Sequence, residues 1–174
     1  NGTGKSSESQ IVILPNGDLR MYSRNTVNYL YYTDSSDGGI TWGPYTKDEA
    51  LYSRNPGNGC MMSFINVEGY VIGPDNEVYT NLIMASYPYY QRNLGVIRIG
   101  YMDEYEPGYP VHWLDSEDYR LTQNNSFIYS CLTQLRNADG SYRNEVSILP
   151  ELDLSDNTGI PYLPTSCWAR AGIS

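Results

Sequence analysis

The chain has 174 residues, 40% of them apolar and 18% charged, and its 11 basic and 20 acidic side chains give a net charge of −9. This acidity, without a cluster of Lys or Arg, excludes nucleic-acid binding and argues against anionic membranes. No apolar run reaches membrane-spanning length, and three cysteines without a Cys-x-x-Cys pair indicate neither a disulfide framework nor a zinc site. The 18 Tyr against 2 Phe suit half-wet, sugar-facing grooves, or simply β-strands, which favour Tyr.

Helical periodicity is almost absent, and short alternating or apolar runs recur between Gly, Pro, Asn and Asp. These runs predict strands at residues 10–14, 19–24, 28–33, 61–67, 78–85, 95–102, 127–135 and 145–149. Asn16-Gly17 predicts a hairpin turn between the first two strands, and Asp139-Gly140 a similar turn before the last. Residues 103–121 are predicted to form a long surface loop. Successive hairpins at this spacing indicate an all-β meander, sandwich or propeller.

Residues 35–42 read Ser-Ser-Asp-Gly-Gly-Ile-Thr-Trp and match the pattern S-x-D-x-G-x-T-W at every fixed position. Ser35 and Asp37 are expected to bind turn amides, Gly39 to adopt a positive φ, and Trp42 to pack under the hairpin. The motif resembles the Asp box of sialidases, which lies on the propeller face away from the active site and also occurs in other propellers. It is a marker of fold, and alone it leaves the function open.

Three further segments resemble those that build the sialidase active site, and they occur in the order of that family. The first is Ser7-Glu8-Ser9-Gln10-Ile11-Val12, followed by Asn16-Gly17 and Tyr22-Ser23-Arg24. The second is Ser86-Tyr87-Pro88 with Arg92-Asn93-Leu94-Gly95-Val96-Ile97-Arg98-Ile99-Gly100. The third, and the most specific, is Phe127-Ile128-Tyr129-Ser130-Cys131-Leu132-Thr133-Gln134-Leu135. The chain is thus similar to the bacterial-type exo-α-sialidases over residues 8–149.

The resemblance implies an all-β fold, part of a six-bladed β-propeller with about three blades present. Residues 1–150 correspond to the C-terminal half of the catalytic propeller. Residues 151–174 form an irregular tail to which we assign nothing, and residues 160–174 are expected to be poorly ordered. The pattern departs from the family at Pro150, where an aromatic is expected and where proline cannot donate a sheet hydrogen bond.

The resemblance also implies roles for four side chains. A carboxylate nucleophile would repel the carboxylate that sialic acid carries on its anomeric carbon, and a neutral phenol avoids this. Tyr129 is therefore the expected nucleophile and Glu8 the base that activates it. Arg24 and Arg92 are expected to bind the substrate carboxylate, because the planar guanidinium donates two parallel hydrogen bonds. Arg98 is the rival to Arg92.

Simpler interpretations exist for several of these residues. Glu8 could be a solvated or turn-capping carboxylate, Cys60 and Cys131 are most simply small buried hydrophobes, and His112 an ordinary loop or strand residue. A catalytically inactive propeller that binds sialosides, or serves only as a structural Asp-box propeller, would keep Asp37 and Trp42 without needing both Glu8 and Tyr129. An unrelated sandwich is the third alternative.

The expected activity is retaining release, or transfer, of terminal α-linked sialic acid from glycans, glycoproteins or glycolipids. No cofactor or metal is expected, and the protein is expected to be secreted or at the cell surface. The family's Arg-[Ile/Val]-Pro stretch and its acid/base Asp do not occur in the expected order within these 174 residues. The missing N-terminal half of the propeller is therefore the expected partner, and the chain alone is expected to be inactive.

Overall fold

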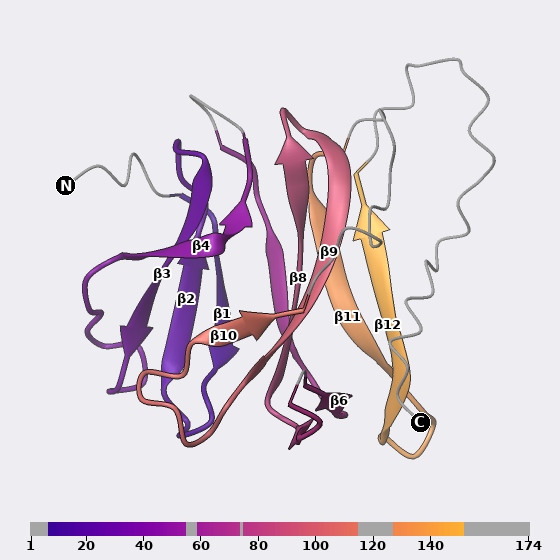
Figure 1. Cartoon of the computed structure of the whole chain (residues 1–174). Coiled ribbons are helices and arrows are strands. Elements are labelled where there is room, and N and C mark those ends of the chain that lie inside the picture. Colours follow the sequence, from indigo (N-terminus) through magenta and orange to yellow (C-terminus); the bar gives the residue numbers. More distant parts are fainter. Residues whose placement is uncertain (1–6, 55–58, 74, 115–126, 152–174) are drawn as a thin grey trace, which may run out of the picture.

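The computed structural model describes residues 7–54, 59–73, 75–114 and 127–151, which form antiparallel sheets packed side by side (Figure 1). The first sheet holds four strands in chain order: β1 (Ser9–Ile13), β2 (Leu19–Ser23), β3 (Tyr29–Ser35) and β4 (Thr46–Tyr52). Its first hairpin turns at Asn16-Gly17 as predicted, with Gly17 at φ 90° and its amide donating to Leu14 O at 2.9 Å. No helix in the described part of the chain is long and apolar enough to cross a membrane.

The second sheet has the order β10-β9-β8-β5. Its strands are β5 (Ser63–Val67), β8 (Leu82–Tyr90), β9 (Asn93–Met102) and β10 (Val111–Trp113), and a small hairpin of β6 (Val71–Ile72) and β7 (Val78–Tyr79) lies between β5 and β8. The prediction of one strand at residues 78–85 is wrong, because residues 80–81 separate two strands: β7 ends at Tyr79 and β8 begins at Leu82. The prediction of a continuous loop at residues 103–121 is also wrong, because β10 pairs with β9; residues 115–121 lie outside the described part.

The third sheet contains two strands, β11 (Ser130–Arg136) and β12 (Tyr142–Pro150), joined by the predicted turn at Asp139-Gly140. Pro150 ends β12 opposite Ser130, and the Glu151 amide then donates to Tyr129 O at 2.6 Å. Proline is accommodated because it stands at the last position of its strand. The expected tail at residues 160–174 lies outside the described part.

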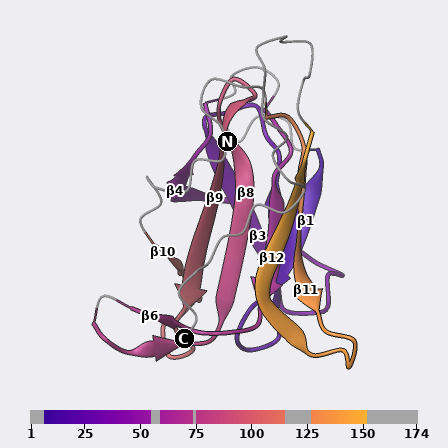
Figure 2. The ribbon, with the colours of Figure 1, turned by 90° about the vertical axis from the view of Figure 1, so that its right-hand side faces the viewer.

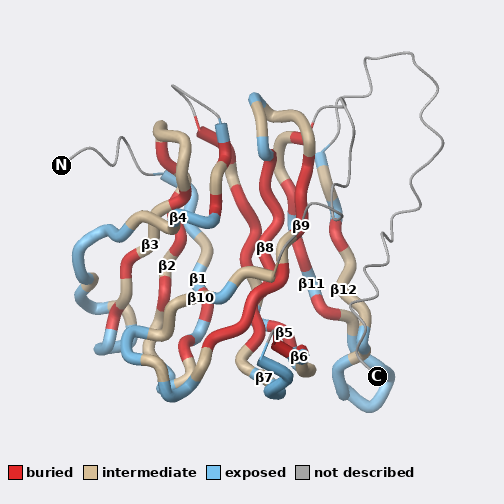
Figure 3. Tube along the Cα trace, viewed as in Figure 1, coloured by how far each residue is buried: buried red, intermediate tan, exposed pale blue. Residues whose placement is uncertain are grey.

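The apolar core lies in two layers, one on each side of the second sheet. One cluster joins the first and second sheets around Tyr22 and Phe64, whose rings stack at 4.0 Å. The other joins the second and third sheets around Phe127 and Leu132. β8 and most of β9 are therefore buried along their length, as Figure 3 shows. Burial on both faces explains the near-continuous apolar sequence of these two strands.

Side-chain amides join the first strands of adjacent sheets, since β5 contacts both β1 and β11. Figure 2 views the molecule from the side of the third sheet, β11 and β12. Asn66 of β5 accepts from Ile13 N and donates to Ile13 O, both at 2.8 Å. Gln134 of β11 accepts from Glu68 N and donates to Glu68 O, both also at 2.8 Å. Each amide thus replaces a backbone ladder bond where neighbouring sheets meet.

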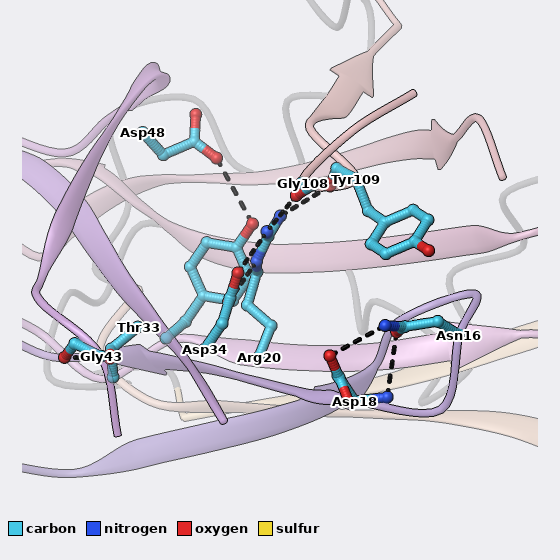
Figure 4. A network of polar contacts seen from close by, with 10 residues as sticks. Asn16, Asp18, Arg20, Thr33, Asp34, Gly43, Asp48, Gly108 and Tyr109 are labelled. Atoms are coloured by element: carbon cyan, nitrogen blue, oxygen red, sulfur yellow. Dashed lines mark hydrogen bonds and ion pairs between the residues drawn. The ribbon is translucent and has the colours of Figure 1, made fainter. Parts of the chain in front are cut away.

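A buried arginine fastens a loop of the second sheet to the first sheet (Figure 4). Arg20, which is 1% exposed, pairs through Nε and Nη2 with both carboxylate oxygens of Asp34 at 2.8 Å. Its nitrogens also donate to the carbonyls of Gly108 and Tyr109, each at 2.9 Å. Because a buried guanidinium needs partners for its charge and its donors, this arginine is a structural residue and not a candidate for ligand binding.

Candidate active site

Three segments that are distant in sequence meet at the end of the sheets where β1 and β11 begin, the upper end in Figure 1. Glu8 immediately precedes β1, Arg24 immediately follows β2, and Tyr129 immediately precedes β11. The β1–β2 ladder extends one step beyond the strands, since Arg24 N donates to Glu8 O at 2.8 Å and Ser7 N to Arg24 O at 3.1 Å. The hairpin register therefore places Glu8 directly opposite Arg24.

One guanidinium nitrogen bridges the proposed base and the proposed nucleophile. Arg24 Nη1 donates to Glu8 Oε1 at 2.8 Å and Oε2 at 3.0 Å, and it also donates to the Tyr129 hydroxyl at 3.3 Å. The Arg24 side chain is 14% exposed and that of Glu8 is 41% exposed. The group is thus open to solvent on the Glu8 side, and it brings together three of the four residues singled out from the sequence.

The electrostatics of the group favour its charged form. The Ser7 hydroxyl, which donates to Glu8 Oε2 at 2.7 Å, is the main cause that lowers the pKa of Glu8; a backbone amide and the charge of Arg24 act in the same direction. Burial opposes ionisation of Arg24 most strongly, but the hydrogen bond to Tyr129 and the charge of Glu8 together raise its pKa. Glu8 is therefore an ionised acceptor at neutral pH.

Contacts on both sides fix the backbone that carries Tyr129. Glu151 exchanges hydrogen bonds with this segment, since Ile128 N donates to Glu151 O at 3.1 Å and Glu151 N donates to Tyr129 O. The Cys60 thiol donates to Ile128 O at 2.7 Å. Phe127 is fully buried in the core. Tyr129 is consequently held by a rigid segment although it precedes the strand.

Arg92 occupies the turn between β8 and β9. Gln91 and Arg92 have φ of 44° and 60° between the paired residues Tyr90 and Asn93, a conformation that costs energy without glycine. The Arg92 carbonyl accepts from Phe127 N at 2.6 Å, which ties this turn to the Tyr129 segment.

The pKa of the Cys60 thiol depends on three charged side chains at this end of the sheets. Burial raises the pKa of its thiol, the positive charges of Arg92 and Arg24 oppose that effect, and the charge of Glu8 adds to it. Arg92 therefore lies in the electrostatic neighbourhood of Arg24 and Glu8. Cys60 is buried, as expected, whereas Cys131 is exposed, so the expectation of burial was wrong for Cys131.

The rival Arg98 lies elsewhere. It donates from Nη1 to Ala50 O and from Nη2 to Leu114 O at 3.4 Å, with its guanidinium carbon 5.8 Å from the centre of the Trp113 ring. These partners belong to the packing between the first and second sheets. Arg98 thus points away from the group formed by Glu8, Arg24 and Tyr129.

The Asp box forms the expected turn at the opposite end of the first sheet, after β3. Asp37 accepts from Thr41 N at 2.8 and 3.0 Å and from Thr41 Oγ1 at 2.6 Å, and Ser35 Oγ accepts from Gly39 N at 2.9 Å. Hydrogen bonds from Thr41, first of all, lower the pKa of Asp37 to about 2. Gly39 has φ 91° and Trp42 Nε1 donates to its carbonyl at 3.1 Å. The box is a structural element remote from the candidate site.

The sequence alone did not single out the residues that pack against the site or bind its side chains, namely Gly59, Gly95 and Ser7. A Cβ on Gly59 would lie 1.8 Å from Asn25 O, and one on Gly95 would lie 2.2 Å from Cδ2 of Phe127. Both glycines are therefore needed for close packing, Gly59 beside Arg24 and Gly95 beneath the Phe127 ring. The available signal for Gly95 was its position within the second motif segment, whereas Gly59 lies outside the three segments; the packing partner of each depends on the tertiary fold. Ser7, which binds Glu8, carried no signal of its own.

No group of three or more His, Cys, Asp or Glu side chains that could hold a metal ion occurs among the residues described. The side chains brought together at this site carry a phenol, a carboxylate and a guanidinium group. Together these can transfer a proton and can bind an anion such as a carboxylate.

Comparison with solved structures identifies the fold. The chain matches the intramolecular trans-sialidase from Ruminococcus gnavus with a TM-score of 0.67 and 32% identity, over 86% of this chain and 29% of that one. It matches the leech intramolecular trans-sialidase with a TM-score of 0.68 and 30% identity, over 86% of this chain and 21% of that one. NanB sialidase from Streptococcus pneumoniae, at 22% identity and a TM-score of 0.64, supports the fold alone over 85% of this chain and 20% of its own. No family model matches the sequence.

These matches confirm the resemblance drawn from the motifs: over 86% of its length the chain has the fold of sialidase catalytic domains, and it matches part of a sialidase-type propeller. The two four-stranded sheets are blades of that propeller, and β11–β12 are two strands of a further blade. The chain spans less than a third of the length of each of these structures.

Proposed function

We propose that this chain supplies the nucleophile, its base and two carboxylate-binding arginines of an exo-α-sialidase that acts by a retaining mechanism. The observation that carries the proposal is the bridging contact of Arg24 with both Glu8 and Tyr129, residues that come from three segments. If Glu8 were only a solvated turn carboxylate and Tyr129 only a surface residue, there would be no reason for both to contact one guanidinium that is 14% exposed.

The chemistry follows from the substrate. The anomeric carbon of a sialoside carries a carboxylate, so an anionic nucleophile would be repelled, whereas the neutral phenol of Tyr129 is not. The phenol becomes nucleophilic when a base takes its proton, and Glu8, whose carboxylate shares the Arg24 Nη1 atom with the Tyr129 hydroxyl, is the candidate for that base. The covalent intermediate on Tyr129 is then resolved by water or by an acceptor hydroxyl. Either outcome retains the anomeric configuration.

Arg24 and Arg92 would bind the substrate carboxylate and orient the anomeric carbon toward Tyr129. Arg24 is suited to this because its charge persists beside Glu8 and its position is fixed by the β1–β2 register. Binding at a fixed position lowers the barrier by orientation as well as by charge. The substrates would be sialylated glycans, glycoproteins or glycolipids.

We further propose that the chain works together with the remaining blades of a six-bladed propeller in a secreted or cell-surface enzyme. Both outer faces of the described sheets expose apolar side chains. Ile11 and Ile13 are 51% and 56% exposed on β1, and Leu149 is 65% exposed on β12. Such faces suit further β-sheets packed against them. The general acid and a third arginine would come from those blades.

Turnover of a fluorogenic sialoside by the complete propeller tests the proposal. Tyr129→Phe is expected to abolish turnover and leave binding of N-acetylneuraminic acid within about twofold, because only the nucleophilic oxygen is lost. Tyr142→Phe, in the hairpin that carries Arg136, is the matched control and should retain turnover. Full activity of Tyr129→Phe would refute the assignment. Binding without turnover by the unmutated complete propeller would instead indicate a non-catalytic, sialoside-binding propeller.

A further inference from the structure

The Arg24 guanidinium already binds the carboxylate of Glu8, the proposed base of Tyr129. Its Nη1 atom contacts both carboxylate oxygens of Glu8, at 2.8 and 3.0 Å, while the Tyr129 hydroxyl is bound to the same nitrogen at 3.3 Å. A carboxylate from a ligand that binds Arg24 must therefore share it with Glu8 or replace Glu8. Two carboxylates on one guanidinium also repel each other.

Ser7 offers Glu8 a second anchor that does not depend on the Arg24 side chain. Its hydroxyl donates to Glu8 Oε2 at 2.7 Å, and its own amide is fixed by the bond to the Arg24 carbonyl at 3.1 Å. If Glu8 loses its contact with the guanidinium, Ser7 still holds one carboxylate oxygen at the site. The other oxygen, Oε1, is then free to turn toward the tyrosine.

We propose that the carboxylate of an incoming sialoside displaces Glu8 from Arg24, and that Ser7 retains the released Glu8 so that it accepts the proton of Tyr129. This inference rests on the proposed function and adds Ser7 to it as a positioning residue. Before the substrate binds, the hydrogen bond from Ser7 and the charge of Arg24 both lower the pKa of Glu8, so Glu8 is a weak base. The arrival of the substrate carboxylate therefore makes the base stronger at the moment when it is needed.

The proton and electron balance is closed. The O–H bond of Tyr129 breaks and a new O–H bond forms on Glu8, while the phenolic oxygen bonds to the anomeric carbon. The glycosidic C–O bond breaks with its electron pair on the departing oxygen, which takes a proton from a carboxylic acid supplied by another blade. In the second half of the reaction, water or an acceptor hydroxyl attacks the anomeric carbon and gives its proton to the carboxylate of that other blade, while the bond to the phenolic oxygen breaks and Tyr129 takes its proton back from Glu8.

Displacement of Glu8 from Arg24 by a ligand carboxylate predicts that ligand binding is coupled to proton uptake. Among the described residues, the titratable groups near Glu8 are Arg24 after β2, Tyr129 before β11 and Cys60 before β5. The charge of Arg92 acts, as that of Glu8 does, on the pKa of the Cys60 thiol. When a ligand carboxylate takes Arg24, Glu8 loses its closest cation and gains a neighbouring anion, so its pKa rises. Binding then takes up protons at pH values between the free and bound pKa of Glu8, and affinity falls as pH increases through that range.

Calorimetric titration of the complete propeller with N-acetylneuraminic acid, in buffers of different ionisation enthalpy, measures this linkage. The unmutated protein should take up protons on binding at acidic pH, above the lowered pKa of Glu8 in the free protein. Glu8→Gln should abolish the uptake and bind about two- to fivefold more tightly, because no carboxylate competes for Arg24. Glu49→Gln removes an equal charge from a surface pair with Lys47 and should behave as the unmutated protein. Binding with no proton uptake refutes the exchange, whereas failure to bind refutes the proposed function.

Ser7→Ala and Ser7→Thr test the positioning role. Removal of the hydroxyl raises the pKa of Glu8 in the free enzyme, so the acidic limb of kcat/KM against pH should move to higher pH in Ser7→Ala. kcat should fall more than KM rises, since the base is misplaced after the substrate has bound. Ser7→Thr, which keeps a hydroxyl, should restore both. An unchanged acidic limb in Ser7→Ala, with an unchanged kcat, would overturn the role of Ser7.

Discussion

The amide of Gln134 provides the clearest test of how the sheets are held together. Gln134, which is 9% exposed, accepts from Glu68 N at 2.8 Å and donates to Glu68 O at 2.8 Å and Arg143 O at 2.9 Å. Gln134→Leu deletes all three hydrogen bonds and leaves their backbone partners poorly solvated. At about 1 kcal/mol for each bond, the free energy of unfolding should fall by about 2–4 kcal/mol.

Urea unfolding monitored by tryptophan fluorescence measures the effect. Thr133→Val, at the adjacent exposed position of the same strand, is the control and should change the free energy by less than about 0.5 kcal/mol. A loss in Gln134→Leu no larger than that in the control would refute the idea that side-chain amides join the blades. The slope of the free energy against urea should stay constant, because the same surface is exposed on unfolding.

Gly95→Ala should lower kcat/KM by about a hundredfold, since its Cβ would lie 2.2 Å from the Phe127 ring and would displace the segment that carries Tyr129, whereas Gly43→Ala, whose nearest contact is 3.5 Å, should retain turnover. Unchanged kinetics in Gly95→Ala would contradict this packing. Asp37, with its pKa lowered to about 2, stabilises the fold above its unfolded pKa near 3.8, and this stability is lost as pH falls through about 2. Thermal unfolding between pH 5 and pH 2 should therefore be less pH-dependent in Asp37→Asn, and an unaltered slope would contradict it.

The parts of the fold that the sequence predicted are those in which local signals and burial agree. Asn16-Gly17 fixed the first hairpin, and the pairing of Ser9 with Ser23 then placed Glu8 opposite Arg24. That half of the site could therefore be predicted from one turn and one strand pattern. β4 was missed because only Leu51 of its residues is buried, so it pairs with β3 without an apolar pattern.

The other half of the site depends on packing that no local pattern encodes. Tyr129 reaches Arg24 because Cys60 binds the carbonyl before it and because the third sheet packs on the second through Phe127. The family motif named Tyr129 as a site candidate, but its spatial relation to Glu8 requires the tertiary fold. Ser7 was missed for the same reason, since a serine beside a glutamate has no distinctive sequence signal.

The central claim, that Glu8 and Tyr129 act as one catalytic unit around Arg24, is tested most directly by a double-mutant cycle on kcat/KM for sialoside hydrolysis. If the two residues serve the same step, the residual rate of the double variant Glu8→Gln/Tyr129→Phe, measured at high enzyme concentration, should be no lower than the residual rate of Tyr129→Phe alone. Losses that multiply, with each substitution lowering the rate by its full factor in the presence of the other, would contradict the account.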